Sequence, residues 1–279
     1  MFDTFKSRLE ITGTLLTITA LRISAGRSSE PIGSDLPVIK DALGRPLIPG
    51  SSLKGAMRSR LESFLRAIDT KLAANPADQN EWSITPLAMK ALKEEKLNDF
   101  ELTQEIIEQT DLISRLFGSP WMSSKLQIRD LTVLTDHWFG QYQERDGVSI
   151  ERDTETAADG KLYDFQVVPA GTPFEFKAIV ENAEPEELGI LMIGLNQLET
   201  EQIPLGGGRS RGLGVVSLKI EKMLYFDVQN DPERLLDYLK KLVSSNRDSA
   251  YEEVTEQQKD DWVKALITKV KNLPSKVSR

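Results

Sequence analysis

Two glycine-containing stretches carry residue types that suit phosphate binding, and the first is residues 49–58 (PGSSLKGAMR). Ser51 and Ser52 precede a helical run, and Lys54 and Arg58 follow one helical turn apart. A helix N-terminus offers unpaired N–H groups and a partial positive charge, which hydroxyls and cations can reinforce. The Walker pattern Gly-x-x-x-x-Gly-Lys-[Ser/Thr] is absent, so a nucleotide P-loop is excluded. A capped amphipathic helix with two solvated cations would explain the same residues.

The second stretch is residues 206–214 (GGGRSRGLG), in which five of the nine residues are glycine. Exposed backbone N–H groups beside two guanidiniums suit bidentate phosphate contacts and base stacking. A flexible hairpin before the last strand is the alternative, and we favour contact with phosphate or RNA. The candidate RNA-binding residues of this stretch are Gly207, Gly208, Arg209, Ser210 and Arg211.

Carboxylates stand out in two loops. Asp35 follows a glycine and a serine, where an aspartate commonly closes an Asx-turn. Beside bound RNA, Asp35 could instead hold a divalent metal or orient a 2′-hydroxyl toward the adjacent phosphate. Asp146, Glu151 and Asp153 could bind a cation, although pairing with the arginines of the same loop is the simpler interpretation.

The composition excludes several kinds of protein. The chain has 279 residues, no Cys and one His, His137, so disulfides, thiol nucleophiles and zinc sites with Cys ligands are excluded. No apolar run approaches the roughly 18 residues of a membrane span, and residues 1–6 lack a signal pattern, so we expect a cytoplasmic protein without a membrane partner. The net charge is −8, yet residues 1–68 hold ten Lys and Arg against six Asp and Glu. This first quarter is therefore a basic island in an acidic protein.

The apolar pattern predicts the elements that position the first candidates. Alternation predicts a strand over 6–23, and the loop over 24–45 has room for a short strand at 38–39. A helix follows, whose first N–H groups Ser51 or Ser52 would cap. Residues 69–115 become acidic and are predicted to be a helical insertion. The apolar face of the first helix consists of Leu53, Met57, Leu61, Phe64, Leu65 and Ile68.

The second half predicts further strands and helices. They are strands within 121–138, a long hairpin over 144–168, a strand pair within 165–180, a helix over 186–198 and a strand over 215–226. The order predicts an α+β fold of the split β-α-β type, with helices on one face of the sheet. We expect a core over residues 1–230 and a helical extension over 231–279. The first helix of the extension has a stripe of Leu235, Leu236, Leu239 and Leu242.

Taken in order, these stretches resemble the RAMP (repeat-associated mysterious protein) superfamily of CRISPR–Cas systems, and within it the backbone subunit of type III effector complexes. The resemblance covers residues 6–223. It rests on residues 33–41 (GSDLPVIKD), 48–55 (IPGSSLKG) with Arg58, 116–118 (LFG), 148–154 (VSIERDT), 168–172 (VPAGT) and 205–214 (LGGGRSRGLG).

The resemblance implies a ferredoxin-like core, similar to an RNA-recognition motif, that stacks in several copies along a guide RNA (crRNA). The hairpin over 144–168 would act as a thumb between guide–target base pairs. Implied partners are crRNA, complementary target RNA, copies of this chain or related RAMP subunits, and other effector subunits including the large signature subunit. The implied RNA-binding residues are Ser51, Ser52, Lys54, Arg58, Arg152 and the 207–211 segment.

Asp35 matches the loop aspartate with which such subunits cut target RNA at regular intervals, using Mg²⁺ or another divalent metal. The implied chemistry is attack by the 2′-hydroxyl on the adjacent phosphate, with the protein mainly orienting the kinked strand. Some relatives hold zinc in an inserted region, but without Cys and with one His we expect no zinc here.

Three alternatives stay open on the sequence alone. Asp35 could be only a turn residue in a non-catalytic, guide-binding scaffold. The chain could be a RAMP endoribonuclease that processes the guide precursor, for which His137 is the available histidine base or acid. It could also be a protein-binding scaffold that does not bind RNA.

Overall fold

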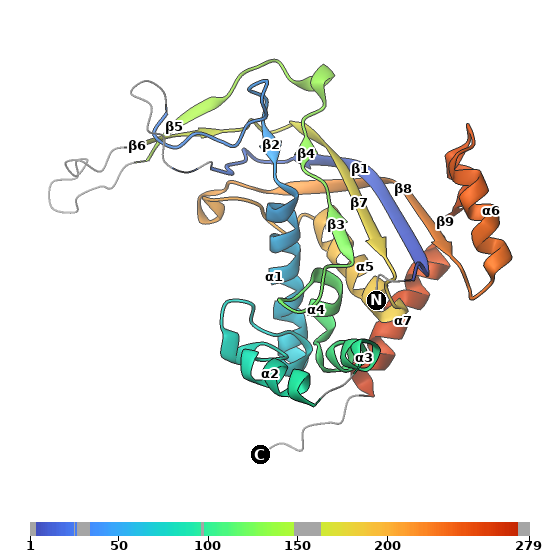
Figure 1. The fold of residues 1–279 in the computed structure, drawn as a ribbon. Helices are drawn as coiled ribbons and strands as arrows, with labels where there is room; N and C mark the ends of the chain where they lie inside the picture. The colour runs from blue at the N-terminus through green and yellow to red at the C-terminus, as the bar shows by residue number, and fades with distance from the viewer. Residues whose placement is uncertain (1–3, 25, 27–33, 96–97, 148–162, 273–279) are drawn as a thin grey trace.

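A computed structural model describes residues 4–24, 26, 34–95, 98–147 and 163–272 of the chain. Its centre is an antiparallel sheet in the order β3–β7–β1–β8–β9, whose strands run side by side across the middle of Figure 1. The predicted α+β class is confirmed. The strands are β1 (Ser7–Thr17), β3 (Leu126–Ile128), β7 (Pro173–Glu181), β8 (Val216–Asp227) and β9 (Glu252–Glu253).

Burial alternates along β1, which gives the sheet one apolar face. Leu9, Ile11 and Leu15 have no exposed surface, whereas Arg8 and Glu10 are only half-buried. Two helices that follow β1 and β7 in the chain, α1 (Gly50–Ile68) and α5 (Pro185–Glu199), pack their apolar side chains into the same core. The sheet and these helices therefore form two layers.

The first strand is shorter than predicted. It ends at Thr17 because the next N–H groups leave the ladder: Ile18 donates to Val215 O at 2.9 Å, and Leu21 donates to Val168 O at 2.9 Å. A further correction concerns residues 38–39, which form no regular strand: Val38 makes an isolated bridge with Ser24, and Ile39 forms single backbone hydrogen bonds with Ile23 and Leu47. A short strand lies instead at β2 (Leu47–Ile48), paired with β4 (Leu131–Thr132).

The two strands predicted within 165–180 are present, but their predicted pairing is wrong because they join different sheets. β6 (Tyr163–Val167) pairs with β5 (Gln143–Gly147), whereas β7 pairs with β1 and β3. The antiparallel β5–β6 pair forms the base of the predicted hairpin, and residues 148–162 lie outside the described residues.

Residues 69–115 hold three α-helices around the C-terminal half of α1, at the foot of the molecule in Figure 1. They are α2 (Pro86–Glu94), α3 (Asp99–Gln109) and α4 (Leu112–Phe117), with the short 3₁₀ turns Thr70–Leu72 and Gln79–Glu81 before them. Thr85, Asn98 and Asp111 each accept a backbone N–H at the start of a helix. These side-chain caps explain where each short helix begins.

The C-terminal segment, residues 231–272, packs on both faces of the sheet at its β8 edge. Helix α7 (Glu256–Lys271) packs on α5 so closely that a Cβ on Gly189 would lie 2.3 Å from Trp262 O. Helix α6 (Pro232–Leu242) packs against Leu224 and Phe226 of β8. Between them, β9 extends the sheet.

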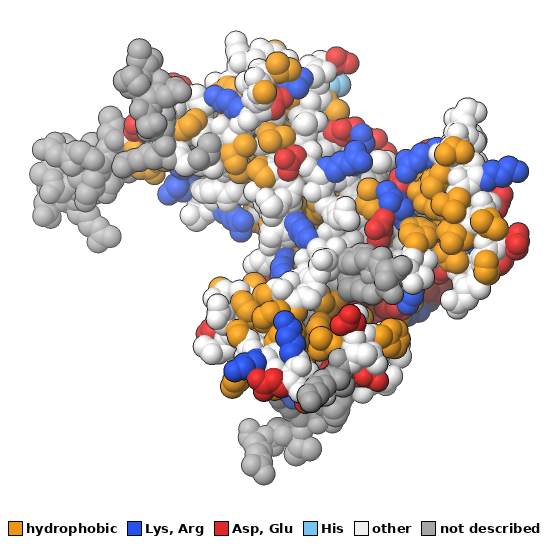
Figure 2. Space-filling view, in the orientation of Figure 1, with side chains coloured by type: hydrophobic (Ala, Val, Ile, Leu, Met, Phe, Trp, Pro, Cys, Tyr) orange, Lys and Arg blue, Asp and Glu red, His pale blue; other side chains and the backbone are white. Residues whose placement is uncertain are grey.

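The predicted apolar stripe of α6 is turned partly the wrong way. Tyr238 is its buried residue, and Leu235 and Leu242 pack beside it. Leu236 and Leu239 are 58% and 50% exposed, and hydrophobic side chains gather over α6 in Figure 2. Half of the stripe, Leu236 and Leu239, therefore faces solvent because an aromatic side chain takes the central place facing β8. Within the described ranges, no helix is long and apolar enough to cross a membrane.

Candidate nucleic-acid interface

The N-terminus of α1 is capped by Asp130 and not, as the sequence suggested, by a serine. The helix begins at Gly50, whose N–H donates to Oδ1 of Asp130 at 2.8 Å, so Ser51 and Ser52 lie inside the first turn. A Cβ on Gly50 would lie 2.2 Å from Ile128 O, so the backbone at the end of β3 packs directly against the start of the helix. The carboxylate satisfies one N–H group and complements the helix dipole, while Ser51 remains exposed.

Lys54 is held by the protein and is not a freely solvated cation. Its Nζ donates to Ser124 Oγ at 2.6 Å and to Leu126 O at 2.9 Å. Burial, together with the nearby charge of Arg58, lowers the pKa of Lys54. Lys54 therefore ties α1 to the segment that leads into β3.

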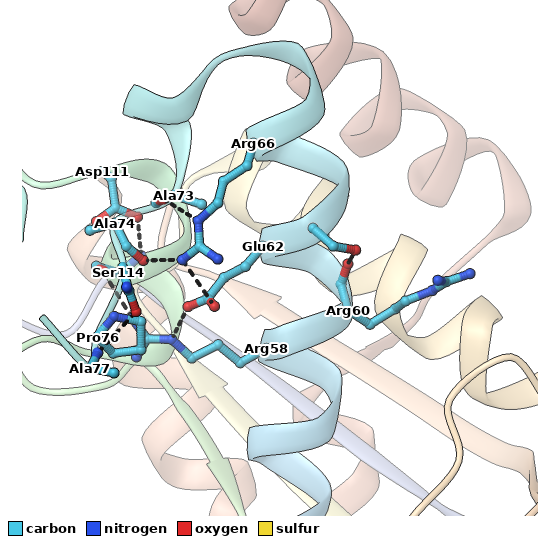
Figure 3. A network of polar contacts seen from close by, with 12 residues as sticks. Arg58, Arg60, Glu62, Arg66, Ala73, Ala74, Pro76, Ala77, Asp111 and Ser114 are labelled. Carbon is cyan, nitrogen blue, oxygen red and sulfur yellow. Dashed lines mark hydrogen bonds and ion pairs between the residues drawn. The ribbon is translucent and has the colours of Figure 1, made fainter. Parts of the chain in front are cut away.

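Arg58 belongs to a network with Glu62 and Arg66, shown in Figure 3. Its Nε lies 2.7 Å from Glu62 Oε1, and its other nitrogens donate to Gly118 O and Ser114 Oγ. Arg66 reaches the same carboxylate at 3.2 Å. Because Glu62 is 5% exposed and flanked by two guanidiniums, the network also fixes the insertion against α1.

The 206–214 loop presents its cations outward. Arg209, Ser210 and Arg211 form an exposed 3₁₀ turn between two left-handed glycines, Gly208 and Gly212, with φ of 78° and 82°. Within the described ranges neither guanidinium makes an ion pair with a carboxylate, although Arg209 donates to Gly206 O. Both charges are thus available to an anionic ligand.

Asp35 is exposed and lies beside the base of the β5–β6 hairpin. Its N–H donates to Oδ1 of Asp164 at 2.9 Å. The next residue, Leu36, forms a parallel bridge with Phe165, and Gln166 N–H donates to Leu36 O at 3.1 Å. The Asp35 carboxylate itself makes no hydrogen bond among the described residues, and the residue is exposed among them.

A small apolar cluster brings the loop of Asp35 and the 206–214 loop together. Phe165 and Val167 of β6 pack with Leu213 of the glycine-rich loop, and Leu36 packs on the same cluster. Residues far apart in the chain thus meet at one hydrophobic anchor. The predicted RNA-binding loop and the loop of the predicted cleavage aspartate therefore both pack against β6.

Arg22 joins this region and was not predicted. Its guanidinium carbon lies 4.5 Å from the centre of the Phe165 ring, and its carbonyl accepts the Gly207 N–H at 2.8 Å. It makes no ion pair with a described carboxylate. The one feature of the sequence that could have pointed to Arg22 as a ligand-binding residue is its place in the basic first quarter of the chain. A cation stacked on an aromatic face beside the loop can also bind phosphate or a base.

Two glycines have no structural reason to be glycine. Among the described glycines, only Gly55 and Gly207 have neither a left-handed φ nor any atom within 4 Å of a Cβ built on them. Both are exposed. Gly55 also lies inside α1, where glycine costs about 0.5–1 kcal/mol relative to alanine. Open space over a bare backbone is what the close approach of a ligand backbone requires.

The remaining predicted residues lie elsewhere. Arg152 is outside the described residues, and His137 is exposed on a 3₁₀ turn (Thr135–His137) after β4. Among the described residues no group of three or more His, Cys, Asp or Glu could hold a metal ion. Mg²⁺ commonly takes one or two carboxylates and completes its shell with water and substrate phosphates. The exposed carboxylate of Asp35 fits such a shared site.

Comparison with known proteins identifies the family. The chain is 30% identical over 219 residues to a Mycobacterium tuberculosis protein named CRISPR system Cms endoribonuclease Csm3, which covers 75% of this chain and 86% of that relative. Proteins of the same name from Streptococcus thermophilus and Methanothermobacter thermautotrophicus are 27% and 28% identical, over 72% and 77% of this chain and 82% and 85% of theirs. The RAMP superfamily profile matches residues 14–217. The chain therefore belongs to the RAMP superfamily.

Proposed function

We propose that this chain is a guide-RNA-binding backbone subunit of a type III CRISPR effector complex, and an endoribonuclease that cuts target RNA paired to the guide. The relatives named as Csm3 endoribonucleases support the class of activity. The observation that carries RNA binding is the pair of unexplained glycines. Gly55 and Gly207 each lie in one of the two stretches whose residue types suit phosphate. No other described glycine lacks both a left-handed φ and a neighbouring atom.

The guide would run over the bare backbone of these two stretches. Gly55 and the neighbouring Ser51 offer a smooth face on α1, and Arg209 and Arg211 offer unpaired cations. Lys54 and Arg58 hold the surrounding segments in place and present only part of their surface to a ligand. Backbone and phosphate contacts of this kind carry no sequence information, which base pairing with the guide supplies.

Asp35 is the proposed cleavage residue. Its exposed carboxylate would orient the 2′-hydroxyl of a kinked target strand in line with the adjacent phosphate. A divalent cation such as Mg²⁺, held by Asp35 and the RNA, would neutralise charge at the phosphate. His137 is remote in sequence from both proposed phosphate-binding stretches, and its side chain has no described polar partner, so we assign it no role.

The fold details of the proposal follow from the strand order. We propose that β3, β7, β1 and β8, with α1 and α5, are a ferredoxin-like core, and that the β5–β6 hairpin is the base of a thumb. The division into a core over residues 1–230 and an extension over 231–279 is part of the proposal. So are stacking with further copies and with other effector subunits, and a cytoplasmic location.

Guide binding can be tested on the glycine-rich loop. The double variant Arg209→Ala/Arg211→Ala should weaken binding of a crRNA in a filter-binding titration and reduce its salt dependence, because each lost phosphate contact lowers the slope of log K against log salt by about 0.7–0.9. The matched control is Lys264→Ala/Lys269→Ala, which removes two cations from α7 on another face. Equal affinities and slopes for wild type and both variants would contradict the proposal.

A further inference from the structure

We infer that Asp164 is a positioning residue for Asp35, an inference that rests on the proposed function. Asp164 lies on β6, and its Oδ1 accepts the backbone N–H of Asp35 at 2.9 Å. This hydrogen bond holds the backbone of Asp35, the residue whose carboxylate is proposed to contact the target strand. Fixing the amide of a residue limits the directions in which its side chain can project.

Neighbouring contacts extend this attachment along the chain. Leu36 forms a parallel bridge with Phe165, and its carbonyl accepts the Gln166 N–H at 3.1 Å. Residues 35–36 therefore run alongside β6 as a short added edge. Within it, the bond from Asp164 is the contact that reaches Asp35 itself.

The charge of Asp164 does not stabilise the β5–β6 hairpin. Asp164 faces Asp146 directly across the β5–β6 pair, and like charges in that arrangement are destabilising. Neither carboxylate makes an ion pair within the part of the chain that the structure describes. The one described partner of the Asp164 side chain is the Asp35 N–H, and a charged acceptor makes that bond stronger than a neutral one.

The described polar side chains next to Asp35 and Asp164 make no second hydrogen bond to Asp35 that could replace the one to Asp164. Ser34 is 4% exposed, and its Oγ has no hydrogen-bond partner in the described structure. Oε1 of Gln166, on the other side of Asp164, is also buried without a partner. Among the described residues, Asp164 is thus the one side chain that holds the backbone of Asp35 itself, which is the reason to expect a measurable effect from its loss.

Cleavage of labelled complementary RNA by the assembled, guide-loaded complex tests this inference under single-turnover conditions with Mg²⁺. Asp164→Ala should slow cutting about tenfold or more, because small misplacements of a reacting group cost up to about 100-fold. The affinity for target RNA should stay within about twofold of wild type. Asp164→Asn keeps an acceptor oxygen and should cut within about threefold of the wild-type rate. The matched control is Asp146→Ala, which deletes the opposing carboxylate and should leave the rate unchanged.

Several outcomes would overturn the inference. If Asp164→Asn is as slow as Asp164→Ala, the charge matters and not the accepted N–H. If Asp164→Ala loses target affinity along with cutting, or if Asp146→Ala is equally slow, the residue supports the hairpin as a whole. If wild type cuts, Asp35→Ala does not, and Asp164→Ala cuts normally, this inference alone fails. A wild-type complex that leaves the target intact would instead refute the proposed function.

Discussion

At the scale of single residues, the bare backbone at Gly55 makes a prediction in which stability and function change in opposite directions. Gly55→Ala should raise the free energy of unfolding by about 0.5–1 kcal/mol, because alanine fits the open helical position better. It should also weaken crRNA binding, because the new methyl group occupies the space proposed for the guide. Urea unfolding and a binding titration on the same sample measure both.

A second glycine provides the contrast. Gly189→Ala should destabilise the fold by about 1–3 kcal/mol, because its Cβ would meet Trp262 O at 2.3 Å, and it should leave the guide affinity of the folded fraction unchanged. If Gly55→Ala binds crRNA as tightly as wild type, the glycine has no role in RNA contact.

The buried pair of Lys125 and Glu187 gives another prediction for single residues. Their charged atoms lie 2.6 Å apart, with side chains 7% and 1% exposed. Burial raises the pKa of Glu187 despite the charge of Lys125. Lys125→Met leaves the carboxylate uncompensated and should cost about 3–5 kcal/mol at pH 7.

The pH dependence of that loss has a definite sign. Removing Lys125 raises the folded-state pKa of Glu187 further above its unfolded value, so the variant loses stability as the pH rises between the two values and regains it as the pH falls. Urea unfolding between pH 5 and pH 8 checks this. Lys264→Met, from an exposed pair with Asp261, should show no such deficit. A pH-independent loss in Lys125→Met would contradict the explanation.

The surroundings of single residues could not be predicted from the sequence. The sequence indicated two stretches whose residue types suit phosphate and placed Asp35 in a loop, but it expected Lys54 and Arg58 to face RNA phosphates or solvent and not to be held by the protein. Their partners Ser124 and Gly118 lie about 60–70 residues further along the chain. Contacts of that separation leave no local pattern, and neither the capping Asp130 nor Arg22 on Phe165 could be read from spacing.

At the scale of elements, one carboxylate of β1 gathers several contacts to the C-terminal segment. Glu10 accepts from Arg8 at 2.8 Å, from Tyr251 at 2.8 Å and from Arg247 at 2.6 Å, and so ties the segment between α6 and α7 to the sheet. Burial alone would raise the pKa of Glu10, but the bonds from Tyr251 and Arg8 and the two guanidinium charges outweigh it and lower the pKa.

This lowered pKa sets the direction of the pH effect. A carboxyl group whose folded pKa is below its unfolded value stabilises the fold above the unfolded pKa, and the gain disappears as the pH falls through the folded pKa. Glu10→Gln should therefore lose about 1.5–3 kcal/mol at pH 7 and less at pH 3, measured by urea unfolding. An equal loss at both pH values would show that the charge of Glu10 is not what holds the segment.

Elements with a regular spacing of apolar residues could be predicted from the sequence. Strands that are defined only by backbone pairing with another strand could not. The helices at 50–68, 185–199 and 256–271 follow apolar spacing, so their existence was read correctly. β9 is two glutamates that pair with β8 through the backbone, and β2 is a two-residue strand. The side-chain pattern says nothing about such pairing. The same reason explains why Phe165 and Phe176 were placed in one hairpin although they belong to different sheets.

At the scale of the whole molecule, the features proposed to bind RNA lie apart from the acidic insertion. In Figure 1 the N-terminal end of α1 and the β5–β6 pair lie toward the top, and the insertion lies at the foot of α1. The basic first quarter of the chain supplies β1, Arg22, the loop of Asp35 and the start of α1. Under the proposed function, this acidic protein would therefore contact RNA mainly through its basic first quarter.

Target cleavage by the assembled complex is the most direct test of the central claim. The complex would be purified with its guide, mixed with labelled complementary RNA and Mg²⁺, and compared with a complex that carries Asp35→Ala. We predict cuts at regular intervals in wild type and none in the variant, with assembly and target binding intact. Unchanged cuts in Asp35→Ala would contradict the account, because the nuclease would then lie in another subunit.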